Sequence, residues 1–122
     1  MKAPVKTVQK PWGHELLFAR TDGYAGKLLF IRAGHQLSLQ YHRQKEETIF
    51  VHAGRMRFVF EEEPGRLVEI EMGPGEAHHI PPGRQHRMIA VEDCTLFEVS
   101  TPELDDVVRL EDRYGREGTS AP

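Results

Sequence analysis

A chain of 122 residues has room for one hydrophobic core and predicts a single domain. Apolar residues make up 39% of the chain and charged residues 29%, a balance too apolar for a disordered tail and too charged for a membrane protein. Sixteen Lys and Arg against 19 Asp and Glu leave a formal net charge of -3, which argues against a general nucleic-acid or anionic-membrane surface. We therefore expect one domain over 1–122, with its core at about 10–116 and a frayed end at 117–122.

The N-terminal segment and the cysteine content bear on the cellular compartment. Residues 1–17 lack the continuous apolar stretch of a signal peptide, and a lone cysteine, Cys94, cannot form an internal disulfide. No apolar run approaches the ~20 residues that span a bilayer. We expect a cytoplasmic protein that contacts neither membrane nor nucleic acid.

Glycine and proline divide the chain into short segments that are typical of β-strands. Polar and apolar side chains alternate in residues 55–60 and 66–72, as they do in half-buried antiparallel strands. Turn signals recur at roughly ten-residue intervals, which predicts an all-β sandwich or barrel. Residues 104–116 have helical spacing and predict a short C-terminal helix or turn outside the β-body. The expected strands, in chain order, are 26–33, 37–42, 47–53, 55–63, 66–72, 77–80, 86–91 and 94–101.

Polar residues with the spacing of metal ligands occur in these strands. Gln40 and His42 are two residues apart, so in a strand they lie on one face together with Ser38. After a polar turn, Glu47 can return to the side of His42, and His86 follows much later. Imidazole, carboxylate and amide groups from adjacent strands suit Zn, Fe, Mn, Ni or Co. On spacing alone, a polar row that faces solvent remains the alternative.

Two longer patterns contain these residues: Gly34-x(5)-Gln40-x-His42-x(4)-Glu47-x(6)-Gly54 and Gly75-x(5)-Pro81-x-Gly83-x(2)-His86. They resemble the two motifs of the cupin superfamily. The first motif usually has histidine at the position of Gln40, and the second usually ends in asparagine where this chain has Ala90. The glutamine variant resembles the mannose-6-phosphate isomerase type II domain, as do the segments at 10–15, 23–24, 37–42, 80–87, 97–100 and 105–116.

The resemblance implies a fold, a metal and a substrate. The fold is a double-stranded β-helix, the cupin jelly roll, and one divalent metal, Zn before Mn, Fe, Ni or Co, is held by Gln40, His42, Glu47 and His86. A sugar phosphate lies above the metal, and the expected substrate-binding residues are Ser38, Arg87, Arg109 and Arg116. Glu47, Lys45 and Arg87 are the expected catalytic residues, because a carboxylate can move a proton and cations can stabilise an enediolate or a phosphate.

The implied activity is that of a metal-dependent isomerase converting mannose 6-phosphate to fructose 6-phosphate through an enediol. Residues 43–48 lack the histidine that relatives commonly carry beside the metal carboxylate, which favours the alternative of a non-catalytic cupin that binds a metal and a sugar phosphate. A metal-dependent oxygenase is a third hypothesis, although oxygenases usually have a more histidine-rich ligand set. Relatives often carry this domain behind a guanylyltransferase domain, for which the chain is too short, so nucleotidyl transfer is not expected.

A subunit contact is also predicted. Leu37, Leu39 and Tyr41 alternate with the polar row and are expected to face away from the barrel. Such an apolar face needs a cover, and in so small a domain a second subunit would supply it. We expect a homodimer.

Overall fold

Residues 1–118, the part of the chain that this computed structural model describes, form eleven β-strands and no helix. Accordingly, nothing in this part of the chain could cross a membrane as a helix. The strands are β1 (Lys6–Lys10), β2 (Gly13–Arg20), β3 (Ala25–Ile31), β4 (Leu39–Tyr41), β5 (Glu47–Ala53), β6 (Met56–Glu63), β7 (Arg66–Met72), β8 (Ala77–Ile80), β9 (His86–Ala90), β10 (Cys94–Ser100) and β11 (Val108–Glu111).

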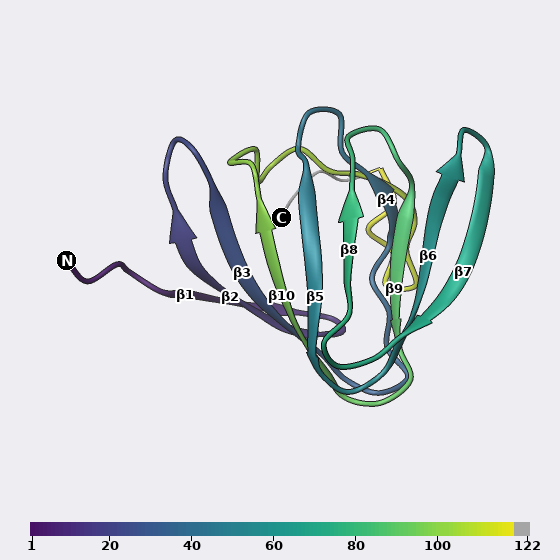
Figure 1. The fold of residues 1–122 in the computed structure, drawn as a ribbon, viewed down its shortest axis with the longest axis horizontal. Helices are drawn as coiled ribbons and strands as arrows, with labels where there is room; N and C mark the ends of the chain where they lie inside the picture. Colours follow the sequence, from purple (N-terminus) through teal and green to yellow (C-terminus); the bar gives the residue numbers. More distant parts are fainter. Residues whose placement is uncertain (119–122) are drawn as a thin grey trace.

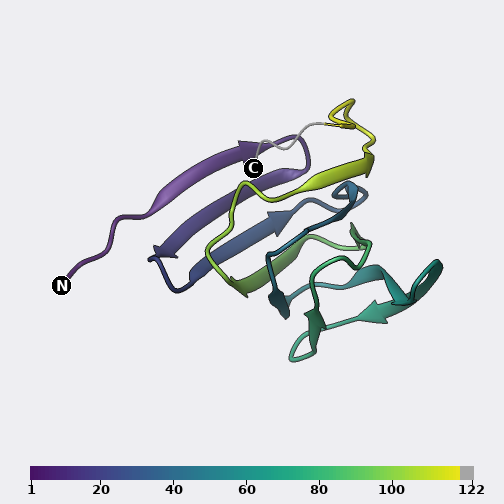
Figure 2. The same cartoon turned by 90° about the horizontal axis from the view of Figure 1, so that it is seen from above.

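The strands form two antiparallel sheets. One has six strands in the order β1-β2-β3-β10-β5-β8, and the other has five in the order β11-β4-β9-β6-β7. Neighbours such as β3 and β10 are distant in sequence, because the chain crosses repeatedly between the sheets in the manner of a jelly roll. The sheets lie close together at one end and spread apart at the other (Figure 1), and Figure 2 shows the two layers from above. The predicted all-β jelly roll is confirmed.

The apolar core and the polar site share the inner faces of the sheets. Along β5, Glu47, Ile49 and Val51 point inward in succession with 2%, 0% and 0% of their surface exposed, as the two-residue period predicts. Phe58 and Met88 fill the space opposite and are equally buried. Glu47 therefore lies at one end of a continuous apolar core, where side-chain packing fixes its position.

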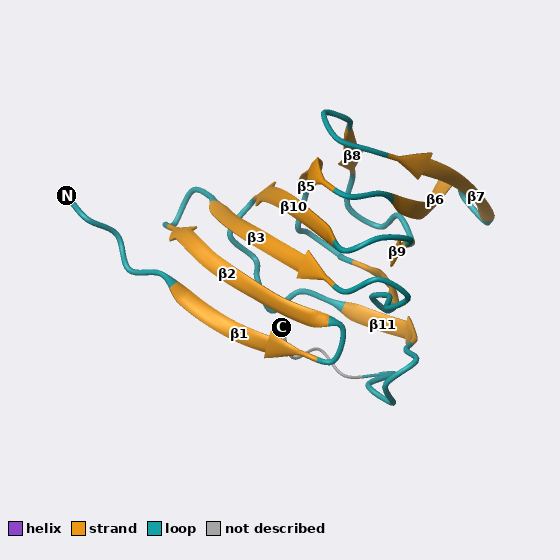
Figure 3. Ribbon diagram, turned by 90° about the horizontal axis from the view of Figure 1, so that it is seen from below, coloured by secondary structure: helices purple, strands orange, loops and turns teal. Residues whose placement is uncertain are grey.

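The C-terminal segment differs from the prediction. Val108–Glu111 form strand β11, which pairs with β4 at the edge of the five-stranded sheet, and no helix is present within 104–116 (Figure 3). Leu104 and Val107, whose spacing suggested a helix, lie before the strand and are 7% exposed. Two apolar residues three positions apart can both be buried by a turn, so their spacing did not distinguish the two structures. The predicted frayed end at 117–122 falls mostly outside the described residues.

Strands β1 and β2 form a hairpin that the sequence did not predict. Its register pairs Val8 with Glu15, and Glu15 is only 5% exposed because it faces inward toward Lys27 of β3. An inward carboxylate interrupts the apolar row by which a strand is usually recognised.

The face predicted to carry Leu37, Leu39 and Tyr41 outward is not formed. Strand β4 spans only Leu39–Tyr41, so the alternation of a strand does not extend back to Leu37. Leu37 packs against the apolar core, and Leu39 is 8% exposed. Leu37 and Leu39 therefore do not form the outward apolar face from which the subunit contact was predicted.

Candidate metal centre

Three buried side chains from both sheets converge on one point. His42 directly follows β4 and His86 begins β9, two paired strands of the five-stranded sheet, whereas Glu47 begins β5 of the facing sheet. Glu47 Oε1 lies 3.2 Å from Nε2 of His42 and 3.2 Å from Nε2 of His86. One ligand atom from each residue lies within 4.8 Å of the others, and we call these three residues the metal triad.

The chain fixes which nitrogen of each imidazole faces the carboxylate. His42 Nδ1 lies 2.6 Å from the carbonyl oxygen of Asp106, and His86 Nδ1 lies 3.0 Å from that of Arg84. A carbonyl oxygen only accepts, so each Nδ1 carries a proton and each ring turns its Nε2 toward Glu47. Two imidazole Nε2 atoms and a carboxylate oxygen that converge in a buried site are a donor set that fits a divalent metal ion, and hydrogen bonds at Nδ1 orient such ligands.

Further contacts agree with this interpretation. Within the described residues, His86 Nε2 is buried and makes no hydrogen bond. Burial acts to raise the pKa of the Glu47 carboxyl, but the close approach of the two histidine rings and the charge of Lys45 outweigh it and hold this pKa well below its usual range. A carboxylate that stays ionised is the form that binds a metal.

Gln40 and Ser38 lie beside the triad. The Cα of Gln40 pairs in register with that of His86, and the Gln40 side chain lines the cavity described below together with His42. Ser38 is fully buried, and its hydroxyl donates a 2.6 Å hydrogen bond to Gln40 Oε1. The structure thus groups three of the predicted ligands and places Gln40 on the strand position next to His86, while Ser38 orients Gln40 and lies where a substrate could not reach it.

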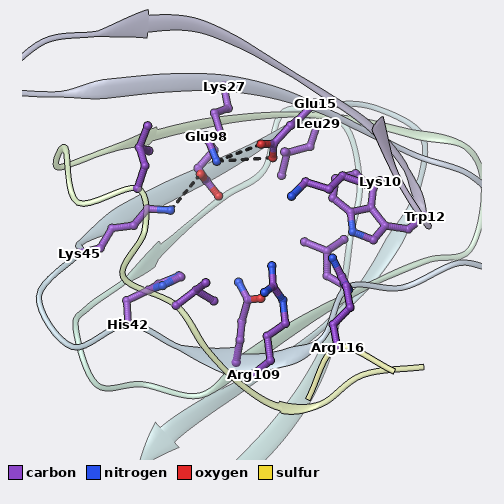
Figure 4. Close-up of a pocket in the computed structure, with 14 residues that line it drawn as sticks. Lys10, Trp12, Glu15, Lys27, Leu29, His42, Lys45, Glu98, Arg109 and Arg116 are labelled. Carbon is purple, nitrogen blue, oxygen red and sulfur yellow. Dashed lines mark hydrogen bonds and ion pairs between the residues drawn. The ribbon is translucent and has the colours of Figure 1, made fainter. Parts of the chain in front are cut away.

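A cavity between the sheets opens beside the triad (Figure 4). His42 and Gln40 form part of its wall, and Trp12, Leu29, Leu37, Leu104 and Val107 supply its apolar parts. Its charged lining is mostly cationic: the cations are Lys10, Lys27, Lys45, Arg109 and Arg116, and the carboxylates are Glu15 and Glu98. A concave site with this excess of positive charge suits an anionic ligand.

Lys45 connects the triad to a second carboxyl group. Its Nζ lies 3.1 Å from Glu47 Oε2 and 3.4 Å from Glu98 Oε2, and all three side chains are at least 90% buried. Burial lowers the pKa of Lys45, but the carboxylates of Glu98 and Glu47 reverse this and raise it, so the ammonium remains charged. Burial and the charge of Glu47 raise the pKa of Glu98. The sequence predicted Lys45 here but missed Glu98.

The opposite wall of the cavity gathers cations from three elements. Burial lowers the pKa of Lys10. The negative charge of Glu15 raises this pKa, but the positive charges of Lys27, Arg109 and Arg116 add to the lowering, so that the net shift is downward. Burial and the charge of Arg116 likewise lower the pKa of Arg109. Arg116 is held in place by Asp112, with both Nε–Oδ2 and Nη2–Oδ1 at 2.9 Å. Mutual repulsion among these groups would be relieved by a bound anion.

Arg87 is the one predicted site residue that lies elsewhere. It follows His86 on β9 and therefore points to the other face of the sheet. Its guanidinium donates to the backbone oxygens of Leu37 and Glu111 at 3.1 and 3.0 Å. These bonds join β9 to the segment before β4 and to β11, so Arg87 supports the sheet and does not contact the cavity.

The comparisons with known proteins agree with this geometry. The Cupin domain family matches residues 27–100, well over half of the chain and a range that contains all four predicted metal ligands. The chain belongs to the cupin family. This cupin is 33% identical over 116 residues to the mannose-1-phosphate guanylyltransferase ManC of Salmonella typhimurium, an alignment that covers 91% of this chain and 23% of that protein. The chain therefore spans less than a quarter of the length of this curated relative.

Solved structures show the same fold. The capsular polysaccharide assembling protein CapF of Staphylococcus aureus superposes on this cupin with a TM-score of 0.78 at 19% identity, over 91% of this chain and 33% of that one. Oxalate decarboxylase of Bacillus subtilis gives a TM-score of 0.78 at 17% identity, over 87% and 30%. At this level of identity the likeness establishes the fold alone.

Asp106 ties the C-terminal segment of this cupin to the metal triad. Its carboxylate accepts hydrogen bonds from the backbone N–H groups of Arg43, Gln44 and Lys45 at 2.6–3.0 Å. Its backbone carbonyl oxygen accepts the hydrogen bond that His42 Nδ1–H donates. Burial acts to raise the pKa of Asp106, but these N–H donors outweigh it and lower the pKa. One residue thus orients both a metal ligand and the loop that carries Lys45.

Asp106→Asn is expected to weaken metal binding about 10-fold to 100-fold, the range typical of residues that orient metal ligands. An amide has one acceptor oxygen instead of two, so backbone N–H groups of residues 43–45 lose an acceptor for their hydrogen bonds. The loop, and with it His42, is then held less firmly. Competition titration with a chelator measures the affinity, and the visible spectrum of the Co²⁺-loaded protein reports the ligand geometry. Asp105→Asn, a change at the exposed neighbour, is the matched control. An unchanged spectrum and affinity in Asp106→Asn would show that Asp106 does not position the site.

Proposed function

We propose that this cupin is a metal-dependent sugar-phosphate isomerase that interconverts mannose 6-phosphate and fructose 6-phosphate. The proposal rests on the position of the buried triad beside a cation-rich cavity. His42 belongs to the triad and, together with Gln40, forms part of the cavity wall. A metal site at one end and positive charge at the other suit a substrate with a carbonyl group at one end and a phosphate at the other.

The relatives support the choice of substrate class. Their name, mannose-1-phosphate guanylyltransferase, concerns a mannose phosphate. Because the chain spans 23% of these proteins, guanylyltransfer is not assigned to it, and only the mannose-phosphate class enters the proposal.

Two imidazoles, a carboxylate and an amide oxygen fit a borderline divalent ion, with Zn preferred and Mn, Fe, Ni or Co as alternatives. Such an ion, when bound, would supply the positive charge that polarises the sugar carbonyl. Gln40, His42, Glu47 and His86 would hold it.

The reaction itself is a proton transfer. A base removes the proton from C2, next to the carbonyl, and the electron pair moves to give an enediolate. The proton of the C2 hydroxyl passes to the oxygen on C1, and a proton is returned to C1 as the C2 carbonyl forms, so that no atom is gained or lost. Glu98 is the best placed base, because it lines the cavity and its raised pKa makes the carboxylate a better proton acceptor. Glu47 was one of the expected catalytic residues, but both of its oxygens are engaged by the histidines and Lys45.

The remaining charged residues would bind and orient the substrate. Lys45, beside Glu98, is placed to stabilise negative charge on the enediolate oxygen. Lys10, Arg109 and Arg116, on the opposite wall, would bind the phosphate, and arginine can do so with two parallel hydrogen bonds.

The test is to purify the protein, measure bound metal by elemental analysis, and follow fructose 6-phosphate formation from mannose 6-phosphate with and without a chelator. We expect turnover that disappears with the metal and returns when it is restored. Absence of turnover in the metal-loaded protein would overturn the isomerase assignment. Calorimetric titration with mannose 6-phosphate would then determine whether the protein is the non-catalytic cupin, which would bind the sugar phosphate without converting it.

A further inference from the structure

A pocket distinct from the cavity borders the metal triad on its other side. It lies between β8, at the edge of the six-stranded sheet, and strands β6 and β9 of the five-stranded sheet, and we call it the β6–β8 pocket. His86 lines this pocket, whereas His42 lines the cavity. The triad side chains are at most 4% exposed, so an ion in solvent reaches them only through an opening in the barrel. Each of these two openings ends at one triad histidine.

The cavity is a poor entrance for a divalent cation. Its lining carries five cations against two carboxylates. The ammonium of Lys45 also lies 3.1 Å from Glu47 Oε2, on the cavity side of the triad. Like charges repel strongly where little water screens them. A divalent ion that approached through the cavity would therefore be repelled along its way and again beside Glu47.

The β6–β8 pocket has the opposite charge and contains metal-binding groups. Two carboxylates, Glu61 and Glu62, line it against one guanidinium, that of Arg84. Arg84 Nη1 donates to the backbone oxygens of Glu61 and Glu62 at 3.0 and 2.8 Å, so this cation is held against the chain. Three of the seven histidines of the chain, including His86, also line the pocket. Negative charge attracts a metal cation, and imidazole is a common ligand for one.

His78 connects the mouth of this pocket with the triad. It is half-buried, between the exposed Glu62 and the fully buried His86. Its Nδ1 donates a 2.8 Å hydrogen bond to the backbone oxygen of His79, so in the neutral ring Nε2 has a lone pair for a metal ion. Its ring centroid lies 4.4 Å from that of Phe60, whose π face carries partial negative charge. The path inward thus offers a cation favourable contacts throughout.

We propose that the β6–β8 pocket is the route by which the divalent metal ion enters and leaves the triad. The carboxylates at the mouth attract the ion, His78 binds it in passing, and His86 binds it before Glu47 and His42 do. The proposal rests on the metal triad of the proposed function and not on the isomerase activity. The two openings would then have separate tasks, because the cation would use one and an anionic substrate the other.

Stopped-flow mixing of metal-free protein with Co²⁺ tests the proposal, with the visible absorption of the bound ion as the signal. We expect Glu62→Lys to slow binding about 10-fold at low ionic strength, the lower end of what electrostatic steering contributes to association rates. Glu69→Lys is the matched control and should bind Co²⁺ at the wild-type rate. Glu69 lies on β7 outside the lining of both openings, and its side chain is 47% exposed, against 53% for Glu62.

Release of Co²⁺ to an excess of chelator measures exit along the same path. Entry and exit over one path share a transition state, so Glu62→Lys should slow both by the same factor and leave the equilibrium affinity at the wild-type value. His78→Phe keeps a ring against Phe58 and Phe60 but lacks the ligand nitrogen, and we expect it to slow both rates as well. Wild-type affinity in these variants also shows that they are folded.

Wild-type entry and exit rates in either Glu62→Lys or His78→Phe would overturn the proposal. Faster entry in Lys10→Gln would also overturn it, because removal of a cavity cation speeds binding only if the ion passes through the cavity. A changed affinity with an unchanged exit rate would assign the effect to the triad rather than to a route. Wild-type protein that binds no Co²⁺ would contradict the metal triad and this route with it. Absence of isomerase turnover leaves all of these rates unchanged, so the two proposals fail separately.

Discussion

His86→Ala protein is expected to purify with almost none of the divalent metal that the wild type binds, and to have no isomerase activity. His86 supplies one of three ligand atoms that lie within 4.8 Å of one another, and its Nδ1 hydrogen bond to Arg84 turns Nε2 toward Glu47. Changes to residues that merely orient ligands cost ~10–100-fold in metal affinity, so the loss of a ligand should cost more than about 100-fold. Elemental analysis after dialysis and competition titration with a chelator measure this loss.

His78→Ala is the matched control for His86→Ala. His78 lies on β8, with its ring centroid 4.4 Å from that of Phe60 and 4.8 Å from that of Phe58, and it is not a member of the triad. We expect this variant to keep its metal, because His78 packs against the rings of Phe58 and Phe60 and contributes no ligand to the triad. Wild-type metal content in His86→Ala, or equal loss in both variants, would contradict the assigned triad.

The triad could be predicted from the sequence because local geometry and two motif patterns gave the same result. The two-residue period placed Gln40 and His42 on one side and turned Glu47 inward with the core, and the structure has them so. Glycine explains part of the second pattern. Gly83 adopts a φ of 80°, which favours glycine, and donates a 2.6 Å hydrogen bond to the His42 carbonyl oxygen, so the loop before His86 is attached to the segment that carries His42.

The cavity could not be predicted in the same way. On β10, Glu98 shares a face with Leu96, while Phe97 and Val99 occupy the other, so both faces of the strand are apolar and the sequence does not indicate which one is inside. The same ambiguity applies to Lys27 on β3, which shares a face with Leu29 while Leu28 and Phe30 occupy the other. A charged residue within an otherwise apolar strand was the available signal.

Glu98→Gln is expected to lower kcat by about 10²-fold to 10⁴-fold, the range typical of a lost general base, while the metal content stays at the wild-type level. Glutamine has the shape of glutamate but cannot accept the substrate proton, and Glu98 is not one of the triad residues. Lys45 keeps its 3.1 Å ion pair with Glu47, so the triad keeps its charged neighbour. Steady-state kinetics with mannose 6-phosphate, together with elemental analysis of the same preparation, measure both quantities.

Glu15→Gln separates a base from a binding residue. Glu15 is the other buried carboxylate of the cavity, but it lies 3.3 Å from Lys27 on the side away from Lys45, and both partners are more than 90% buried. Its loss leaves the charge of Lys27 less balanced, so we expect a changed KM with kcat close to that of the wild type. The two carboxylates of one cavity would thus affect different kinetic constants. Equal losses of kcat in Glu98→Gln and Glu15→Gln would indicate that Glu98 contributes only to the charge balance of the cavity. Another group would then have to move the proton, and Glu47 is the remaining carboxylate beside Lys45.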